Sequence, residues 1–432
     1  QWLADGRLQI TIGADLLDYP HRHRELHPTL GAHYRHELRL LDTPQHPTAL
    51  VVSGTLFFHD LCEALEQNDI AVFSWDVHTA DEAELRRTAK RVQARLALAI
   101  NHTHGLAEAC DELGLPLIEW EIDPSTDSLR TTSARSAHVF TWRHSQVERY
   151  RRSGYRSSYL PLASNPARRF PTPLTAAEQQ DYGVPVAYVG SSMVERGNKL
   201  AREFVRWFAK VHPGAANDAA SIVQQLLTVQ RGQGNRYVVP QMLRQVAPML
   251  EAQFAQAGCP HRPDTLVGEA AAAEYRLRTL AHVAPLGLHV WGDAGWKALE
   301  NYGATWRGWA GHYHELNRIY SGAAVHVDVG RLYQLDIVPM RIFDVLACGG
   351  FVIAEHSDAL VECLKPGVEI ETWRTPAELV DKVRWYQRNE QARRYLVSAG
   401  RARVLREHTI AHRLEHMLAN LDALDAALPI AV

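Results

Sequence analysis

The stretch PMRIFDVLACGGFVIA, residues 339–354, predicts a short helix that ends at two glycines and leads into a buried strand. Its first apolar residues recur at the three- and four-residue spacing of a helix. Gly349 and Gly350 allow the positive φ at which many helices end. The apolar run after them has the length of a buried strand. This local order is typical of an α/β fold.

The same helix carries charges in a pattern that suits a nucleotide. Arg341 and Asp344 lie three residues apart on one helix face, and Asp336 precedes Asp344 by eight residues. Helix N-termini and guanidinium groups bind phosphate, and carboxylates accept the hydroxyls of ribose. The pattern therefore predicts a site for a diphosphate attached to a ribose. The alternative is an ordinary exposed Arg341–Asp344 pair, which would contribute only about 0.2–0.5 kcal/mol.

Strands and helices also alternate in the first part of the chain. Apolar runs of strand length lie at 48–52, 70–75, 115–120 and 138–142, with helical spacing between them. This order predicts a parallel sheet with helices on both faces, whose ligands lie beyond the carboxyl ends of the strands. The alternative for any polar group at those ends is an ordinary loop or helix-capping residue. The candidates for a catalytic base there are His59, Asp76 and Asp123.

A proline-rich, polar segment separates this half from a second alternation of strands and helices. We place a hinge between Pro161 and Pro185. The expected organisation is an N-terminal Rossmann-like domain at 1–165, a linker at 166–184, a C-terminal domain at 185–405 with a helical insertion at about 214–284, and a last helix at 406–432.

The second domain opens with a strand at 186–189 that runs into Gly190 and Ser191. Two cations, Arg196 and Lys199, follow shortly before or within the next helix. A glycine, small polar residues and cations at the start of a helix predict a cradle for a diphosphate. The pattern is neither a P-loop nor a dinucleotide fingerprint.

The run from Arg341 into the last helix resembles the C-terminal half of the CgeB-like, spore-maturation-type glycosyltransferases. Segments 101–128 and 155–166 are similar to the N-terminal half of that family. The family pattern Arg-x-Phe-Glu-x-x-x-Cys-Gly-Gly falls here on Arg341, Phe343, Asp344, Cys348, Gly349 and Gly350. Where the family has Glu in this pattern, this chain has Asp344.

The resemblance implies an α/β, GT-B fold: two Rossmann-like domains that face a central cleft, with the last helix crossing back onto the first. It implies a hexosyltransferase-type enzyme that uses a nucleotide-sugar donor and needs no metal and no further cofactor. The second domain would bind the donor, and the first an unidentified acceptor. The expected donor-binding residues are Gly190, Ser191, Arg196, Lys199, Gly292, Asp293, Asp336, Arg341, Asp344, Gly349 and Gly350.

The composition gives no sign of a nucleic-acid, membrane or metal partner. Lys and Arg total 46 against 49 Asp and Glu, which gives no basic surplus for nucleic acid. No apolar run has the length of a membrane span. The five cysteines are scattered and lack metal-ligand spacing, and the 23 histidines show no metal motif. We expect free thiols and a cytoplasmic location.

Two other functions share this sequence pattern. One is a catalytically silent GT-B-like protein that binds nucleotides as a scaffold. The other is an epimerase or hydrolase of sugar nucleotides on the same fold, since a fold does not fix its chemistry. The sequence leaves open the sugar, the base, the acceptor, the oligomeric state, and whether the anomeric centre is inverted or retained.

Overall fold

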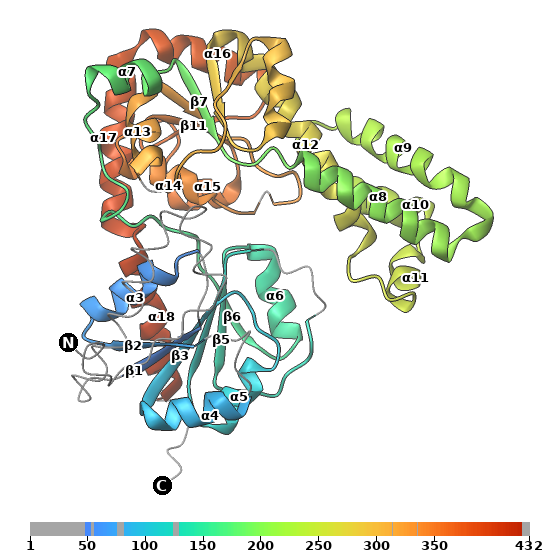
Figure 1. The fold of residues 1–432 in the computed structure, drawn as a ribbon, viewed down its shortest axis with the longest axis vertical. Helices are drawn as coiled ribbons and strands as arrows, with labels where there is room; N and C mark the ends of the chain where they lie inside the picture. The colour runs from blue at the N-terminus through green and yellow to red at the C-terminus, as the bar shows by residue number, and fades with distance from the viewer. Residues whose placement is uncertain are drawn as a thin grey trace, which may run out of the picture.

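The computed structural model of this protein describes residues 48–52, 56–75, 82–123, 129–312, 314–334 and 336–425. Two α/β domains lie one above the other, and a helical arm projects from the side of the second domain (Figure 1). The predicted GT-B arrangement of two Rossmann-like domains is confirmed. The helix and the strand predicted within residues 339–354 are also present.

The first domain is built on a parallel sheet of order β2-β1-β3-β4-β5-β6. Helices cover both faces, because alternate residues of β1 enter two different cores. Ala49 and Val51 pack with α3 and α18, whereas Leu50 and Val52 pack with α4 and α5. The strands are β1 (Thr48–Val52), β2 (Ala71–Trp75), β3 (Ala94–Ile100), β4 (Leu117–Glu121), β5 (Ala137–Thr141) and β6 (Arg156–Tyr159), and the helices are α3 (Phe58–Gln67), α4 (Glu82–Arg91), α5 (Leu106–Glu112) and α6 (His144–Arg152).

The second domain repeats this design with a parallel sheet of order β12-β11-β10-β7-β8-β9. The strand order reverses between β7 and β10, which are neighbours in the sheet although far apart in the chain. Crevices at such reversals are the usual ligand sites of open α/β sheets. The strands are β7 (Val186–Val189), β8 (Leu288–Trp291), β9 (Thr305–Trp306), β10 (Val325–Val327), β11 (Val352–Glu355) and β12 (Glu371–Trp373).

The arm contains five α-helices and has a hydrophobic core of its own. Its two long helices pack closely, because a Cβ on Gly197 would lie only 2.8 Å from the Cα of Ala270. The arm therefore begins before residue 214, the start expected for the insertion. Its elements are α8 (Val194–Val211), η1 (Pro213–Asp218), α9 (Ala219–Arg231), α10 (Val239–Val246), α11 (Leu250–Gln256) and α12 (Pro263–Val283).

The last helix returns to the first domain (Figure 1). Ile410, Leu414 and Met417 of α18 enter the core that also holds α3 and one face of the first sheet. No helix in the described part of the chain is both long and apolar enough to cross a membrane. The remaining elements are α7 (Ala176–Tyr182), η2 (Ala284–Leu286), η3 (Ala294–Tyr302), α13 (His314–Gly322), α14 (Met340–Ala347), α15 (Asp358–Cys363), α16 (Pro376–Arg388), α17 (Glu390–Glu407) and α18 (Ile410–Asp425).

The quoted stretch folds as its pattern predicts. Pro339 caps α14, and Gly349 has a φ of 74° directly after the helix. Gly350 comes close to the backbone of α13, where a Cβ would lie 2.3 Å from the carbonyl oxygen of Tyr320. Strand β11 then starts at Val352. The two glycines thus end the helix and let β11 begin against its neighbour.

Candidate functional site

The candidate site lies at the carboxyl ends of β7 and β10, where the strand order reverses. Arg341, in the first turn of α14, reaches this point. Its Nε donates to the carboxylate of Asp328, and its Nη2 donates to the carbonyl oxygen of Val329 at 3.2 Å. Its guanidinium also lies over the ring of Tyr188, 5.1 Å from the centroid.

Arg341 is a firmly charged group in this position. Burial works against its charge, but the carboxylate of Asp328 outweighs burial and raises the pKa of Arg341 further above its usual range. Only 3% of the side chain of Asp328 is exposed. Arg341 therefore stays charged, and Asp328 balances that charge at the carboxyl edge of the sheet.

The carboxylate of Asp293 fixes the conformation of the loop after β7 through hydrogen bonds. Asp293 accepts hydrogen bonds from Ser191 Oγ at 2.8 Å, Ser192 N at 2.7 Å and Gly295 N at 3.0 Å. Burial opposes ionisation of Asp293, but these bonds outweigh it and lower its pKa. Asp293 therefore shapes the loop at Gly190 and Ser191, and its oxygens already have partners.

Gly292 and Gly190 meet where the loops after β8 and β7 touch. A Cβ on Gly292 would lie 2.1 Å from the carbonyl oxygen of Gly190, and Gly292 has a φ of 151°. Any side chain at 292 would push the two loops apart. Gly190, Ser191, Gly292 and Asp293, all expected from the sequence, are thus brought together.

Arg196 and Lys199 lie on α8, the first helix of the arm. Arg196 is half exposed and pairs through Nε with the buried Glu269, Oε1 at 3.3 Å. Lys199 is exposed to solvent on the same helix. The structure therefore neutralises one of the two cations expected for the diphosphate with a carboxylate of α12.

Asp336 contacts the first domain. Its carboxylate accepts a hydrogen bond from Ser145 N at 3.0 Å, in the first turn of α6, and lies 3.5 Å from Arg143 Nε. Burial works against its ionisation, but Arg143 and the Ser145 hydrogen bonds outweigh burial and lower the pKa of Asp336. Asp336 thus joins the two domains across the cleft.

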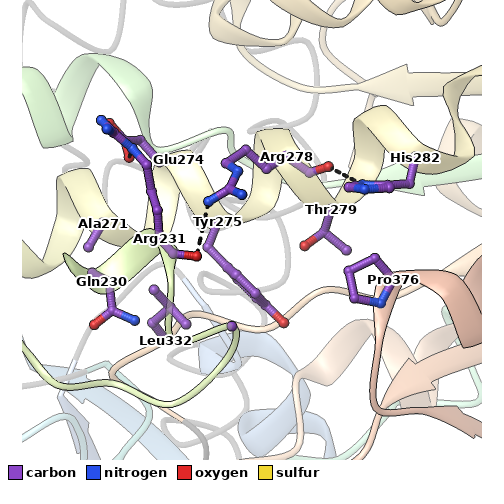
Figure 2. Close-up of a pocket in the computed structure, with 11 residues that line it drawn as sticks. Gln230, Arg231, Ala271, Glu274, Tyr275, Arg278, Thr279, His282, Leu332 and Pro376 are labelled. Atoms are coloured by element: carbon purple, nitrogen blue, oxygen red, sulfur yellow. Dashed lines mark hydrogen bonds and ion pairs between the residues drawn. The ribbon is translucent and has the colours of Figure 1, made fainter. Parts of the chain in front are cut away.

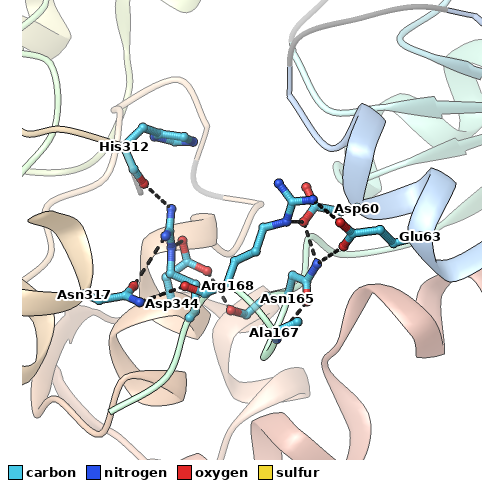
Figure 3. Close-up of polar contacts among 10 residues, drawn as sticks. Asp60, Glu63, Asn165, Ala167, Arg168, His312, Asn317 and Asp344 are labelled. Carbon is cyan, nitrogen blue, oxygen red and sulfur yellow. Dashed lines mark hydrogen bonds and ion pairs between the residues drawn. The ribbon is translucent and has the colours of Figure 1, made fainter. Parts of the chain in front are cut away.

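Asp344 faces the linker, as Figure 3 shows. It is buried, accepts a hydrogen bond from Ser164 Oγ at 2.7 Å and forms an ion pair with Arg169, Nε at 3.1 Å. Arg169 also donates to the carbonyl oxygen of His312 at 2.8 Å. The alternative of an exposed Arg341–Asp344 pair is therefore wrong. Arg341 pairs with Asp328, and Asp344 pairs with Arg169.

Gly349 and Gly350 lie at the other end of α14, next to the start of β11. A ligand beyond the carboxyl ends of the strands lies at the opposite edge of the sheet. Eight helical residues, about 12 Å, separate the two ends of α14. Gly349 and Gly350 therefore lie away from that edge, and their contact with the donor stays a prediction.

The candidate bases occupy different environments. His59 is buried in α3 and lines an interdomain pocket with Asp60, Arg168, Met340 and Asp344. Asp123 is exposed after β4 and accepts a long hydrogen bond of 3.3 Å from Asn101. Asp76 lies outside the described residues.

The sequence did not identify two residues of α12 that extend to the carboxyl edge of the sheet, Tyr275 and Arg276. Tyr275 donates to Glu355 at the end of β11, at 2.5 Å, and Arg276 bridges the loops after β7 and β10. Burial raises the pKa of Glu355. A helix in an insertion gives no local signal that its side chains reach a sheet edge, so only the structure identifies them.

A second pocket lies between the arm and the second domain (Figure 2). Its walls come mainly from α9 and α12, with Leu332 and Pro376 opposite. Arg231 and Glu274 form two hydrogen bonds there, at 2.7 Å and 2.8 Å. Because these charges compensate each other, the pocket presents no free charge from this pair.

Comparison with known proteins gives the class. Residues 272–419 match the family model described as "Glycosyl transferase-like", a segment that runs from α12 into α18. No curated protein matches the chain. The segment from α12 into α18 is thus similar to the glycosyl transferase-like family, and the paired Rossmann-like domains have the GT-B architecture.

Two solved structures share the fold. One is HepE of Anabaena in complex with UDP and glucose, at 12% identity and a TM-score of 0.50, covering 88% of this chain and 100% of that one. The other is sucrose-phosphate synthase of Thermosynechococcus elongatus, with the same identity, coverage and TM-score. At this identity the likeness concerns the fold.

Proposed function

We propose that this glycosyltransferase binds a nucleotide sugar at the carboxyl edge of the second sheet and transfers its hexosyl group to an acceptor held by the first domain. The observation that carries the proposal is the reversal of strand order between β7 and β10, at their carboxyl ends. A glycine loop held by Asp293 and the charged group of Arg341 meet there. HepE, which shares the fold, is described in complex with UDP and glucose.

In this proposal the protein acts mainly by positioning and by electrostatics. Cleavage of the glycosidic bond to phosphate leaves the developing negative charge on the diphosphate. Arg341 is held in place by Asp328 before the reaction, so it needs no reorganisation to face that charge. The acceptor hydroxyl would lose its proton to a first-domain base, of which His59 and Asp123 are the described candidates.

The finer assignments are also proposals. The Arg341-x-Phe343-Asp344 pattern with Cys348, Gly349 and Gly350 supports the CgeB-like subtype. Metal-independent transfer is supported by guanidinium groups at the crevice, which supply positive charge without an ion. A cytoplasmic location is supported by the five cysteines, all of which are free.

A thermal-shift screen tests the proposal. The protein is melted alone and with a panel of nucleoside diphosphates and nucleotide sugars, because a ligand of the native state raises the melting temperature. Any nucleotide sugar that binds is then incubated with the protein, and free sugar and nucleoside diphosphate are measured. Stabilisation with slow hydrolysis supports a transferase, whereas stabilisation without turnover supports the silent scaffold.

Two further outcomes separate the remaining alternatives. Release of an epimerised sugar would support an epimerase. Repeating the screen in excess EDTA tests the metal: we expect the same stabilisation, and a loss that a divalent ion restores would contradict metal independence. No stabilisation by any nucleotide would contradict the proposed function as a whole.

A further inference from the structure

The pocket between the arm and the second domain is a cavity that the proposed function does not use (Figure 2). It has a volume of about 460 Å³, open mouth included. Small-molecule sites have volumes of about 300–1,000 Å³ and often lie where two structural units meet. One face of α12 forms the longest wall, because its lining residues recur at three- and four-residue spacing. They are Ala271, Glu274, Tyr275, Arg278, Thr279 and His282.

The interior of this pocket is largely apolar. Ala271 and Leu332 are each only 2% exposed, and both line it. The ring of Tyr275 and Pro376, the first residue of α16, complete the apolar surface. A flat or aliphatic group bound there would leave water for an apolar wall, which is favourable.

The rim of the pocket carries a cation without a matching carboxylate. Arg231 and Glu274 compensate each other through two hydrogen bonds. Arg278 is exposed, and its Nη1 donates only to the carbonyl oxygen of Arg231, at 3.3 Å. Among the described residues no carboxylate pairs with Arg278, and its Nε and Nη2 have no hydrogen-bond partner. These two N–H groups form the edge of a guanidinium that binds a carboxylate through two parallel hydrogen bonds.

Tyr275 connects the pocket to the carboxyl edge of the second sheet. Its ring lines the pocket, and its hydroxyl donates to Glu355 Oε1 at 2.5 Å. The other oxygen of Glu355 accepts from Gly330 N at 2.9 Å. Gly330 follows Val329, whose carbonyl oxygen accepts from Arg341 at 3.2 Å. A ligand that packs on the ring of Tyr275 therefore acts on residues beside the proposed donor site.

We propose that this pocket is an effector site for a small organic carboxylate. The apolar body of the ligand packs against Leu332, Pro376 and Tyr275, and its carboxylate binds Arg278. The ligand favours the position of the Tyr275 ring that keeps the bond to Glu355, and so strengthens donor binding at the neighbouring edge. This coupling rests on the function proposed above, whereas the pocket itself does not.

Titration of the protein with benzoate, followed by the NMR signals of the ligand, tests the site. The wild type should bind benzoate about tenfold more tightly than acetate, which lacks the ring, and than benzyl alcohol, which lacks the charge. Arg278→Gln should bind benzoate about tenfold more weakly, and Arg278→Lys, which keeps the charge, should lose less. Arg202→Gln, on the exposed face of α8, is the matched control and should bind like the wild type.

The coupling is measured with a nucleoside diphosphate first shown to bind the wild type. Saturating benzoate should tighten nucleotide binding by the wild type about fivefold, which is the low end of ordinary coupling between two sites. Tyr275→Phe keeps the ring and should still bind benzoate. Because its bond to Glu355 is lost, benzoate should leave its nucleotide affinity unchanged.

Several outcomes would overturn the inference. Equal binding of benzoate and acetate, or equal binding of benzoate by the wild type and Arg278→Gln, would exclude the site. Displacement of benzoate by the nucleotide would place the carboxylate at the donor edge instead. Nucleotide affinity that benzoate leaves unchanged or weakens in the wild type, or an equal response in Tyr275→Phe, would exclude the coupling.

Failure of this inference and failure of the proposed function give different results. Turnover of a nucleotide sugar by a protein that does not bind benzoate would leave the function and remove the effector site. Benzoate binding that is lost in Arg278→Gln, with no nucleotide bound by any of the proteins, would keep the carboxylate site and remove both the transferase and the coupling.

Discussion

The two charged residues of α14, Asp344 and Arg341, contact two parts of the molecule that differ in how their polar groups are paired. Asp344 faces the linker, where Arg169, Ser164 and the carbonyl oxygen of His312 complete a balanced, buried network. Arg341 faces the edge of the second sheet, where the buried hydroxyl of Tyr188 has no hydrogen-bond partner among the described residues. The first network is satisfied by the protein alone. The second is not, and we infer that a ligand completes it.

The comparison shows why spacing alone did not assign these residues. Asp344 follows Asp336 by eight residues, which matches a ribose-binding pattern. Its carboxylate oxygens, however, already accept hydrogen bonds from Ser164 and Arg169. Charge balance among buried neighbours separates a structural pair from a binding site. The predictions below test that separation on each side of α14.

The largest effect is expected at Asp344. Asp344→Ala leaves Arg169 buried without its carboxylate, which should lower the free energy of unfolding by about 3–5 kcal/mol. Denaturant unfolding measures it. The control is the double variant Asp344→Leu with Arg169→Met, which removes both charges and should be much milder. A single variant as stable as the wild type would show that this network is not structural.

A smaller effect is expected at Asp293, on the crevice side. Asp293→Ala leaves Ser192 N and the loop hydroxyls without their acceptor, which should cost about 1–3 kcal/mol. Asp293→Asn keeps one acceptor oxygen and serves as the matched control. Unfolding and nucleotide binding are measured on both. Normal stability and normal binding in the alanine variant would exclude a role for Asp293 in shaping the loop.

The smallest effect is expected at Asp336, which joins the domains through Arg143 and Ser145. Its pKa is lowered in the folded protein, so its contribution is present above the unfolded value of about 3.9 and is lost as the pH falls through the folded value. The contribution should be about 1 kcal/mol. Stability profiles of the wild type and Asp336→Asn should therefore converge in acid. Parallel profiles down to low pH would contradict this.

Much of the fold follows from local pattern. The helix at Met340–Ala347, the glycine stop and the strand at Val352–Glu355 need only periodicity and glycine geometry. The alternation of strands and helices likewise predicts two parallel sheets. The loop at Gly190 is identified by its place after a strand.

The partners of the charged residues could not be predicted in the same way. Ser164 and Asp344 are 180 residues apart in the chain, and Ser145 and Asp336 are 191 apart. Arg276 reaches the sheet edge only because α12 continues from the arm onto the second domain. Such contacts depend on how domains and insertions pack, and no short sequence pattern records them.

The most direct test of the account asks on which side of α14 the nucleotide binds. The double variant Arg341→Gln with Asp328→Asn removes a guanidinium from the crevice and keeps the local charge balanced. Arg168→Gln changes a cation that lines the interdomain pocket beside Asp344. Both are titrated calorimetrically with a nucleoside diphosphate first shown to bind the wild type.

We expect the Arg341→Gln, Asp328→Asn variant to bind about tenfold to a hundredfold more weakly, with a normal unfolding transition, and Arg168→Gln to bind like the wild type. The reverse result, with binding lost in Arg168→Gln and kept in the crevice variant, would place the nucleotide in the interdomain pocket and contradict the account.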